Sequence, residues 1–72
     1  MSADLLPLHL MTDLVEALDD DEREVINGLY WERTTVRTIA GRLNVGVATV
    51  GRIHERALAH LKEGAAGLME AL

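Results

Sequence analysis

In this 72-residue chain, the basic residues give the clearest indication of a binding function. Residues 1–32 hold nine carboxylates and one arginine, a balance of −8, whereas residues 33–72 hold six basic and three acidic residues, a balance of +3. Cations gathered in one half suit phosphate binding, although a net charge of −5 argues against holding nucleic acid by charge alone. The six cations are Arg33, Arg37, Arg42, Arg52, Arg56 and Lys62.

Catalytic and metal-binding chemistry finds little support in the residue types. The chain has no cysteine, which excludes disulfides, zinc–thiolate sites and a thiol nucleophile, and its only serine is Ser2. His9, His54 and His60 lack metal-ligand spacing, and the acidic run 19–22 lacks the loop pattern of a calcium site. We therefore expect no enzyme activity, no metal and no cofactor.

The basic half has the apolar spacing of a helix-turn-helix over about residues 35–62. The pattern predicts a short helix at 35–43 and a longer one at 47–62, separated by a break at residues 44–46. The residues expected to face the core from these two helices are Ile39, Ala40, Leu43, Val50, Ile53, Ala57, Leu58 and Leu61.

Three residues strengthen this interpretation. Thr35 is placed to cap the first helix of the motif, Ala40 is small where two helices must approach, and Val45 can fill the gap at the turn. In a DNA-binding helix-turn-helix the second helix lies in the major groove, which predicts double-stranded DNA as the partner. The same shape also serves as a plain three-helix packing unit.

The acidic half predicts two further helices, at about residues 8–18 and 20–31. One of the aspartates at 19–21 is expected to cap the second of these helices. Gly28 lies inside it and marks either a close helix crossing or nothing. The expected core residues are Met11, Leu14, Val15, Leu18, Val25, Ile26, Leu29 and Tyr30.

Together these elements predict one all-α domain over residues 1–72, with four helices and a C-terminal helix-turn-helix. Residues 63–72 have two interpretations: the last helix ends at Gly64, or it continues because apolar residues keep to one face. The sequence contains neither a signal peptide pattern nor an apolar run long enough to span a bilayer. A cytoplasmic protein without membrane contact is therefore expected.

A set of short motifs in one ungapped register carries a family resemblance. They are LDDDEREVI (18–26), YWE (30–32), TVRTIA (35–40), LNV (43–45), TV (49–50) and ERALAHLK (55–62). In these motifs the chain resembles region 4 of bacterial sigma factors. The resemblance implies recognition of the −35 promoter element and contact with the flap of the RNA polymerase β subunit. The chain departs from the family wording at Asp19, Thr38, Asn44 and Gly46.

The predicted DNA contacts lie in the helix-turn-helix. The start of its second helix is expected to read base edges, with an arginine on guanine and apolar contacts to a thymine methyl. The predicted base contacts are Thr49, Arg52, Val47 and Ala48, and the predicted phosphate contacts are Arg37, Arg42 and Arg56. For Arg56 an alternative stays open, an ion pair with an acid of an earlier helix such as Glu22 or Glu24.

Two other functions fit the same residues. The acidic balance and the apolar start of the recognition helix suit a protein-interaction module with weak or no DNA binding. A LuxR-type output domain, which dimerises and binds DNA, has a similar size and helix count. A homodimer is the expected assembly if the apolar ends meet across a two-fold axis, namely Leu5, Leu6, Leu8, Leu68, Met69 and Leu72.

Overall fold

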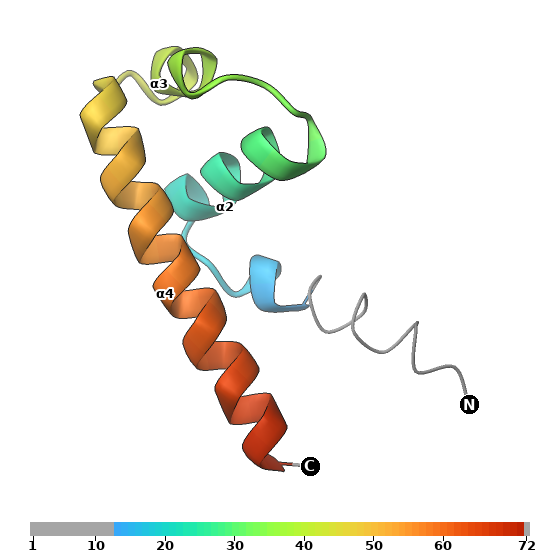
Figure 1. Cartoon of the computed structure of the whole chain (residues 1–72). Coiled ribbons are helices and arrows are strands. Elements are labelled where there is room, and N and C mark those ends of the chain that lie inside the picture. Colours follow the sequence, from blue (N-terminus) through green and yellow to red (C-terminus); the bar gives the residue numbers. More distant parts are fainter. Residues whose placement is uncertain (1–12, 72) are drawn as a thin grey trace.

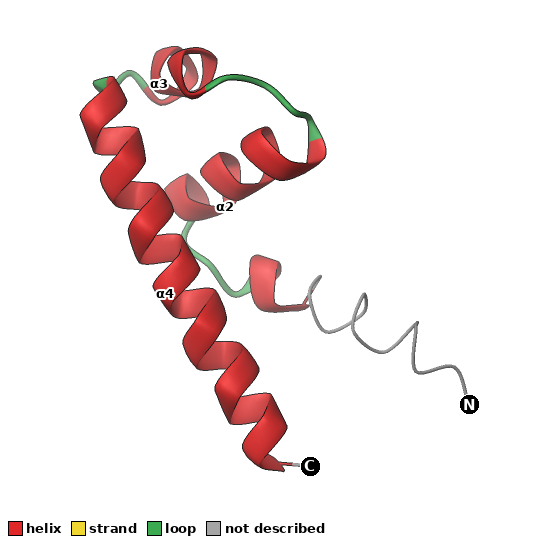
Figure 2. Cartoon of the chain, viewed as in Figure 1, coloured by secondary structure: helices red, strands yellow, loops and turns green. Residues whose placement is uncertain are grey.

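The computed structural model describes residues 13–71, with side chains described for residues 13–67. This part of the chain is helical and contains no strand (Figure 1; Figure 2). A helical turn at residues 13–16 precedes the other elements, which are α2 (Asp20–Ile26), its π-helical continuation η1 (Asn27–Trp31), α3 (Val36–Leu43) and α4 (Val47–Ala71). The predicted all-α fold with a C-terminal helix-turn-helix is confirmed.

The longest helix, α4, is the element on which the others assemble. It has 25 residues; α2 and α3 pack against it, and its C-terminal part extends beyond both (Figure 1). The helix passes Gly64 without a break, so the continuous-helix interpretation of the tail holds as far as Ala71. None of the described helices combines the length and apolar character needed to cross a membrane.

The apolar residues form two clusters along α4. The first lies under the helix-turn-helix and joins it to α2, and the second joins the helical turn at 13–16 to the middle of α4. The first contains Val25, Ile39, Ala40, Val50 and Ile53, and the second contains Val15, Leu18, Ile26 and Ala57, with Leu61 packed against it. These residues were predicted to face the core, and their positions in the two clusters confirm the helical periodicity read from the sequence.

Local capping signals set the ends of the helices. Asp19 is the extended residue before α2, and its N–H donates to the Glu22 carboxylate at 3.1 Å. Thr35 caps α3 as predicted, because its hydroxyl accepts from the Thr38 N–H at 3.1 Å. Asn44 ends α3 in the left-handed conformation, which a short polar side chain tolerates. The predicted break at residues 44–46 is thereby confirmed.

The predicted burial of Tyr30 is wrong, because the helix changes type before it reaches this residue. Residues 27–31 are π-helical, and the Glu32 N–H donates to the carbonyl of Asn27, five residues earlier. The wider turn shifts the register of the side chains that follow Ile26. As a result Tyr30 is 56% exposed.

Three further expectations need correction. The first helix was expected to reach Leu18, but its helical residues end at 16, because Asp19 must be extended to cap α2. Val45 is 37% exposed and does not fill the turn; Leu43 packs against the core instead. Leu58 is 43% exposed, since α4 turns Ala57 inward. Of the other expected core residues, Met11 lies outside the described residues, as do the side chains of the apolar ends.

Gly28 marks a close crossing, the first of its two interpretations. It is buried in η1, and a Cβ at this position would lie 2.8 Å from Cδ1 of Ile39 in α3. Hydrogen in place of a side chain lets the two elements approach. This contact sets α3 against the α2–η1 segment and so orients the helix-turn-helix.

Candidate nucleic-acid interface

The start of α4 is held by the core on one side and is open on the other. Val50 and Ile53 are buried in the first apolar cluster, which fixes the rotation of the helix. The N–H groups of Thr49 and Val50 donate to the Gly46 carbonyl at 3.1 and 3.2 Å, so the helix begins directly after the turn. The side opposite the core is therefore accessible over the first two turns.

All four predicted base-contact residues lie on these turns. Val47 is 52% exposed, Ala48 and Arg52 are exposed, and Thr49 is half-buried. Arg52 makes no hydrogen bond or ion pair with any described residue. The surface is small and mostly apolar with one cation, which limits hydrogen bonding to bases to Arg52 and Thr49.

The three predicted phosphate-contact residues fall into different environments. Arg37 is exposed on the first turn of α3 and has no ion-pair partner in the described part of the chain. Arg42 lies 2.6 Å from a carboxylate oxygen of Glu32 and 3.3 Å from one of Glu24. The hydrogen bonds to Glu32 and Glu24 raise the pKa of the Arg42 guanidinium. Arg42 is half exposed and keeps one side toward solvent.

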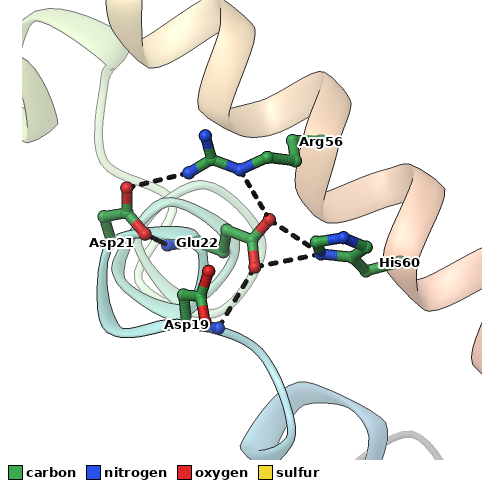
Figure 3. A network of polar contacts seen from close by, with 5 residues as sticks. All are labelled: Asp19, Asp21, Glu22, Arg56 and His60. Carbon is green, nitrogen blue, oxygen red and sulfur yellow. Dashed lines mark hydrogen bonds and ion pairs between the residues drawn. The ribbon is translucent and has the colours of Figure 1, made fainter.

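Arg56 belongs to a network around a buried carboxylate at the junction of α2 and α4 (Figure 3). Glu22 is fully buried; Nε of Arg56 donates to its Oε2 at 3.0 Å, and Nδ1 of His60 lies 2.9 and 3.1 Å from its two oxygens. A second Arg56 nitrogen donates to Asp21 at 2.9 Å. The alternative of an ion pair with Glu22 is thus observed, and the network joins the two helices.

The network keeps Glu22 ionised despite its burial. Burial alone would raise the pKa of Glu22, but hydrogen bonds from the Asp19 N–H, Arg56 and His60 lower it below its ordinary value of 4.5. A hydrogen bond to Glu22 also raises the pKa of Arg56. Sequence reasoning did not assign a role to His60. The signal was its spacing of four residues from Arg56, which places both on one side of α4.

A second accessible feature is a groove beside η1. Tyr30 forms its wall nearest α4: the phenol oxygen lies 2.8 Å from Nε2 of His54, and the two rings stack with centroids 5.8 Å apart. The groove combines apolar walls with a charged rim and is lined by Val15, Glu16, Arg23, Ile26, Asn27, Tyr30 and Trp31. Sequence reasoning missed it because Tyr30 was placed in the core.

The described residues offer no cluster of three or more His, Asp or Glu side chains suited to holding a metal ion.

Comparison with known protein families gives a match that includes the helix-turn-helix. The family described as Sigma-70, region 4 matches residues 14–63, which is more than half of the chain. The matched range holds α2, η1, α3 and the N-terminal part of α4. A search of curated proteins gave no significant match.

Proposed function

The chain belongs to the Sigma-70 region 4 family of DNA-binding helix-turn-helix domains, and we propose that it reads a promoter sequence through the start of α4. The observation that carries the proposal is the open side of the first two turns of α4, with Arg52 unpaired at its centre. A recognition helix contacts base edges with its N-terminal residues, and these turns are the part of α4 that the core leaves free.

Each residue of this surface has a proposed role. Arg52 donates two hydrogen bonds to the O6 and N7 of a guanine, the commonest specific contact in the major groove. The Thr49 hydroxyl bonds a neighbouring base edge, and Val47 or Ala48 contacts a thymine methyl group. Because one bidentate contact carries most of the readout, the recognised sequence is expected to be short.

The cations on α3 have a different proposed role. Arg37 contacts a phosphate directly, and Arg42 does so with the side that Glu32 and Glu24 leave open. Arg56, first assigned to a phosphate, is proposed to act mainly through the Glu22 network that holds α4 in place. Few phosphate contacts imply a shallow dependence of affinity on salt, about 0.9 in the log–log slope for each contact.

The test begins with selection of bound duplexes from a random-sequence DNA pool. The selected duplex and a scrambled one are then titrated with wild type, Arg52→Ala and the matched control Lys62→Ala at two salt concentrations. Lys62 is also an exposed cation of α4 without a partner among the described residues, about 15 Å along the helix from Arg52. We expect only Arg52→Ala to reduce the preference for the selected duplex. Failure of wild type to bind any duplex would overturn the proposal.

Sedimentation of the same samples measures the assembly state. A dimer with two recognition helices is proposed because a single site offers few contacts. A species of 7.9 kDa in free solution and one copy per duplex would contradict the dimer without affecting the DNA-binding proposal.

A second function, protein binding through the groove beside η1, is favoured by the exposed aromatic residues Tyr30 and Trp31. We propose that it receives an apolar helix of RNA polymerase, the partner that the family resemblance implies. Trp31→Ala should weaken binding to purified polymerase core, whereas Leu58→Ala, which changes an exposed apolar residue that does not line the groove, should not. Equal binding by both variants and wild type would remove this candidate.

A further inference from the structure

Arg33 has a backbone conformation that its side chain does not favour. Its φ is 57°, and only Arg33 and Asn44 combine a positive φ with a side chain in the described part of the chain. Asn44 is accounted for, because it ends α3 and a short polar side chain tolerates this region. The long side chain of an arginine is not suited to this backbone conformation in the way a short polar side chain is, and glycine would adopt it at lower cost. Local backbone preference therefore does not explain the residue at position 33.

The backbone around Arg33 is fixed from both sides. The Glu32 N–H donates to the Asn27 carbonyl at 2.9 Å, and the Thr34 N–H donates to the Gly28 carbonyl at 2.9 Å. These bonds tie the loop to η1, which in turn contacts α3 through Gly28. Arg33 is thus presented at a defined place by main-chain contacts alone.

The side chain of Arg33 has no intramolecular use among the described residues. It is exposed and forms neither a hydrogen bond nor an ion pair there, although the preceding residue, Glu32, is a carboxylate. Glu32 pairs with Arg42 instead, at 2.6 Å. A full positive charge is therefore available at position 33 for a partner outside the chain.

The position of Arg33 fits one edge of the proposed DNA interface. Arg33 and Arg37, both exposed and unpaired among the described residues, lie just before α3 and in its first turn, whereas Arg52 lies in α4, beyond the turn that follows α3. The eight residues of α3 span about 12 Å, close to the width of the major groove of about 12 Å. With α4 in the groove, cations at the start of α3 can reach a bordering phosphate chain.

We propose that Arg33 is a phosphate-anchoring residue that works with Arg37 to position one DNA strand along the start of α3. The inference rests on the proposed function, since it requires duplex DNA as the ligand. A phosphate contact fixes the register of the protein on DNA but carries no sequence information. Arg33 should therefore contribute equally to binding of the selected and the scrambled duplex.

The experiment compares Arg33→Gly and Arg33→Lys with wild type and with Lys62→Ala. Arg33→Gly removes the charge and relieves the backbone, so we expect a higher melting temperature together with weaker DNA binding, about three- to tenfold at low salt. The slope of log affinity against log salt should shrink by about 0.9, the value for one phosphate contact. Arg33→Lys should keep most of the slope, and Lys62→Ala should keep all of it.

The outcomes separate this inference from the function on which it rests. If wild type binds DNA and Arg33→Gly keeps the wild-type affinity and slope, the assignment of Arg33 is wrong while DNA binding stands. A loss of slope in Lys62→Ala equal to that in Arg33→Gly, or a loss in Arg33→Lys as large as in Arg33→Gly, would also overturn it. If wild type binds no duplex, the proposed function itself fails.

Discussion

Arg52 and Arg56 lie one turn apart on α4, yet their environments differ completely. Arg56 donates to the buried carboxylate of Glu22 and to Asp21, whereas Arg52 contacts no described side chain. Their spacing of four residues puts both on one side of the helix. The difference comes from α2, whose acidic first turn lies opposite Arg56. The neighbouring element, and not the helix itself, decides which arginine is structural and which is free.

The same comparison explains how a chain with a net charge of −5 can present cations to DNA. Two acidic residues of α2, Asp21 and Glu22, form ion pairs with Arg56 at the junction with α4. The start of α4 and the start of α3 contain no acidic residue in their first turns. Acidic and basic residues are therefore separated within the fold, and the net charge of the chain is a poor guide to the charge of the surface proposed to bind DNA.

The largest effect is expected at Glu22, the buried partner of the structural arginine Arg56. We expect Glu22→Ala to lower the free energy of unfolding by about 3 kcal/mol, because it removes several charge-assisted hydrogen bonds from a buried site. Urea unfolding followed by circular dichroism measures the loss. The control Glu55→Ala changes an exposed carboxylate of α4 and should stay within about 0.5 kcal/mol of wild type. Similar losses in both variants would contradict a special role for the junction.

The pH dependence of stability gives a second, smaller effect at the same site. Because folding lowers the pKa of Glu22, its contribution is complete above the ordinary value of 4.5 and is lost as pH falls through the lower folded value. Arg56 and His60 contact this carboxylate and Asp21 contacts Arg56, so the comparison must isolate Glu22 (Figure 3). The stability difference between wild type and Glu22→Gln should shrink as the pH falls below 4.5. A difference that grows on acidification would show the opposite sign of linkage.

On the other side of the comparison, Arg52 should govern sequence discrimination. We expect Arg52→Ala to reduce the preference for the selected over the scrambled duplex by about 1–3 kcal/mol, the worth of one bidentate base contact. Arg37→Ala should weaken both duplexes alike, because phosphate contacts do not specify sequence. Fluorescence anisotropy titrations of both variants on both duplexes decide the matter. Parallel losses for the two variants would remove the distinction between reading and anchoring.

The sequence predicts the parts of this fold that depend on local chemistry. Thr35 and Asn44 act within one turn of their own backbone, and the apolar stripe from Val50 to Ala57 needs only helical spacing. Arg56 was predicted with an open alternative, since its partner lies 34 residues away on another helix. Spacing identifies such a cation as a candidate but cannot show whether an acid reaches it.

The expectations that failed depend on contacts between elements. Tyr30 is exposed because the helix becomes π-helical where Gly28 meets Ile39, and nothing in the residues around Tyr30 announces that change. Leu58 has the spacing of a core residue, but it is 43% exposed, and the neighbouring Ala57 is buried in the second cluster instead. The groove beside η1 follows from the exposure of Tyr30 and was therefore not predictable from periodicity.

The smallest expected effect concerns Arg42, which lies between the two classes of arginine. Its bonds to Glu24 and Glu32 are exposed, so Arg42→Ala should lower stability by at most about 1 kcal/mol. In DNA binding, the carboxylates of Glu24 and Glu32 compete with the DNA phosphates for Arg42. Arg42 should therefore contribute less to the affinity than Arg37, which has no such partners among the described residues. Glu32→Gln removes the nearer competitor at 2.6 Å and should therefore strengthen binding to both duplexes about twofold at low salt.

A double-variant cycle separates release of Arg42 from the loss of a negative charge near the phosphates. If Glu32 acts by holding Arg42, Glu32→Gln should strengthen DNA binding in wild type but not in Arg42→Ala, and the coupling should fade as salt rises. If the gain persists in Arg42→Ala, the carboxylate repels DNA on its own account, and Arg42 belongs with Arg56 as a structural cation. The cycle thus assigns Arg42, which the geometry leaves between an ion pair and the solvent.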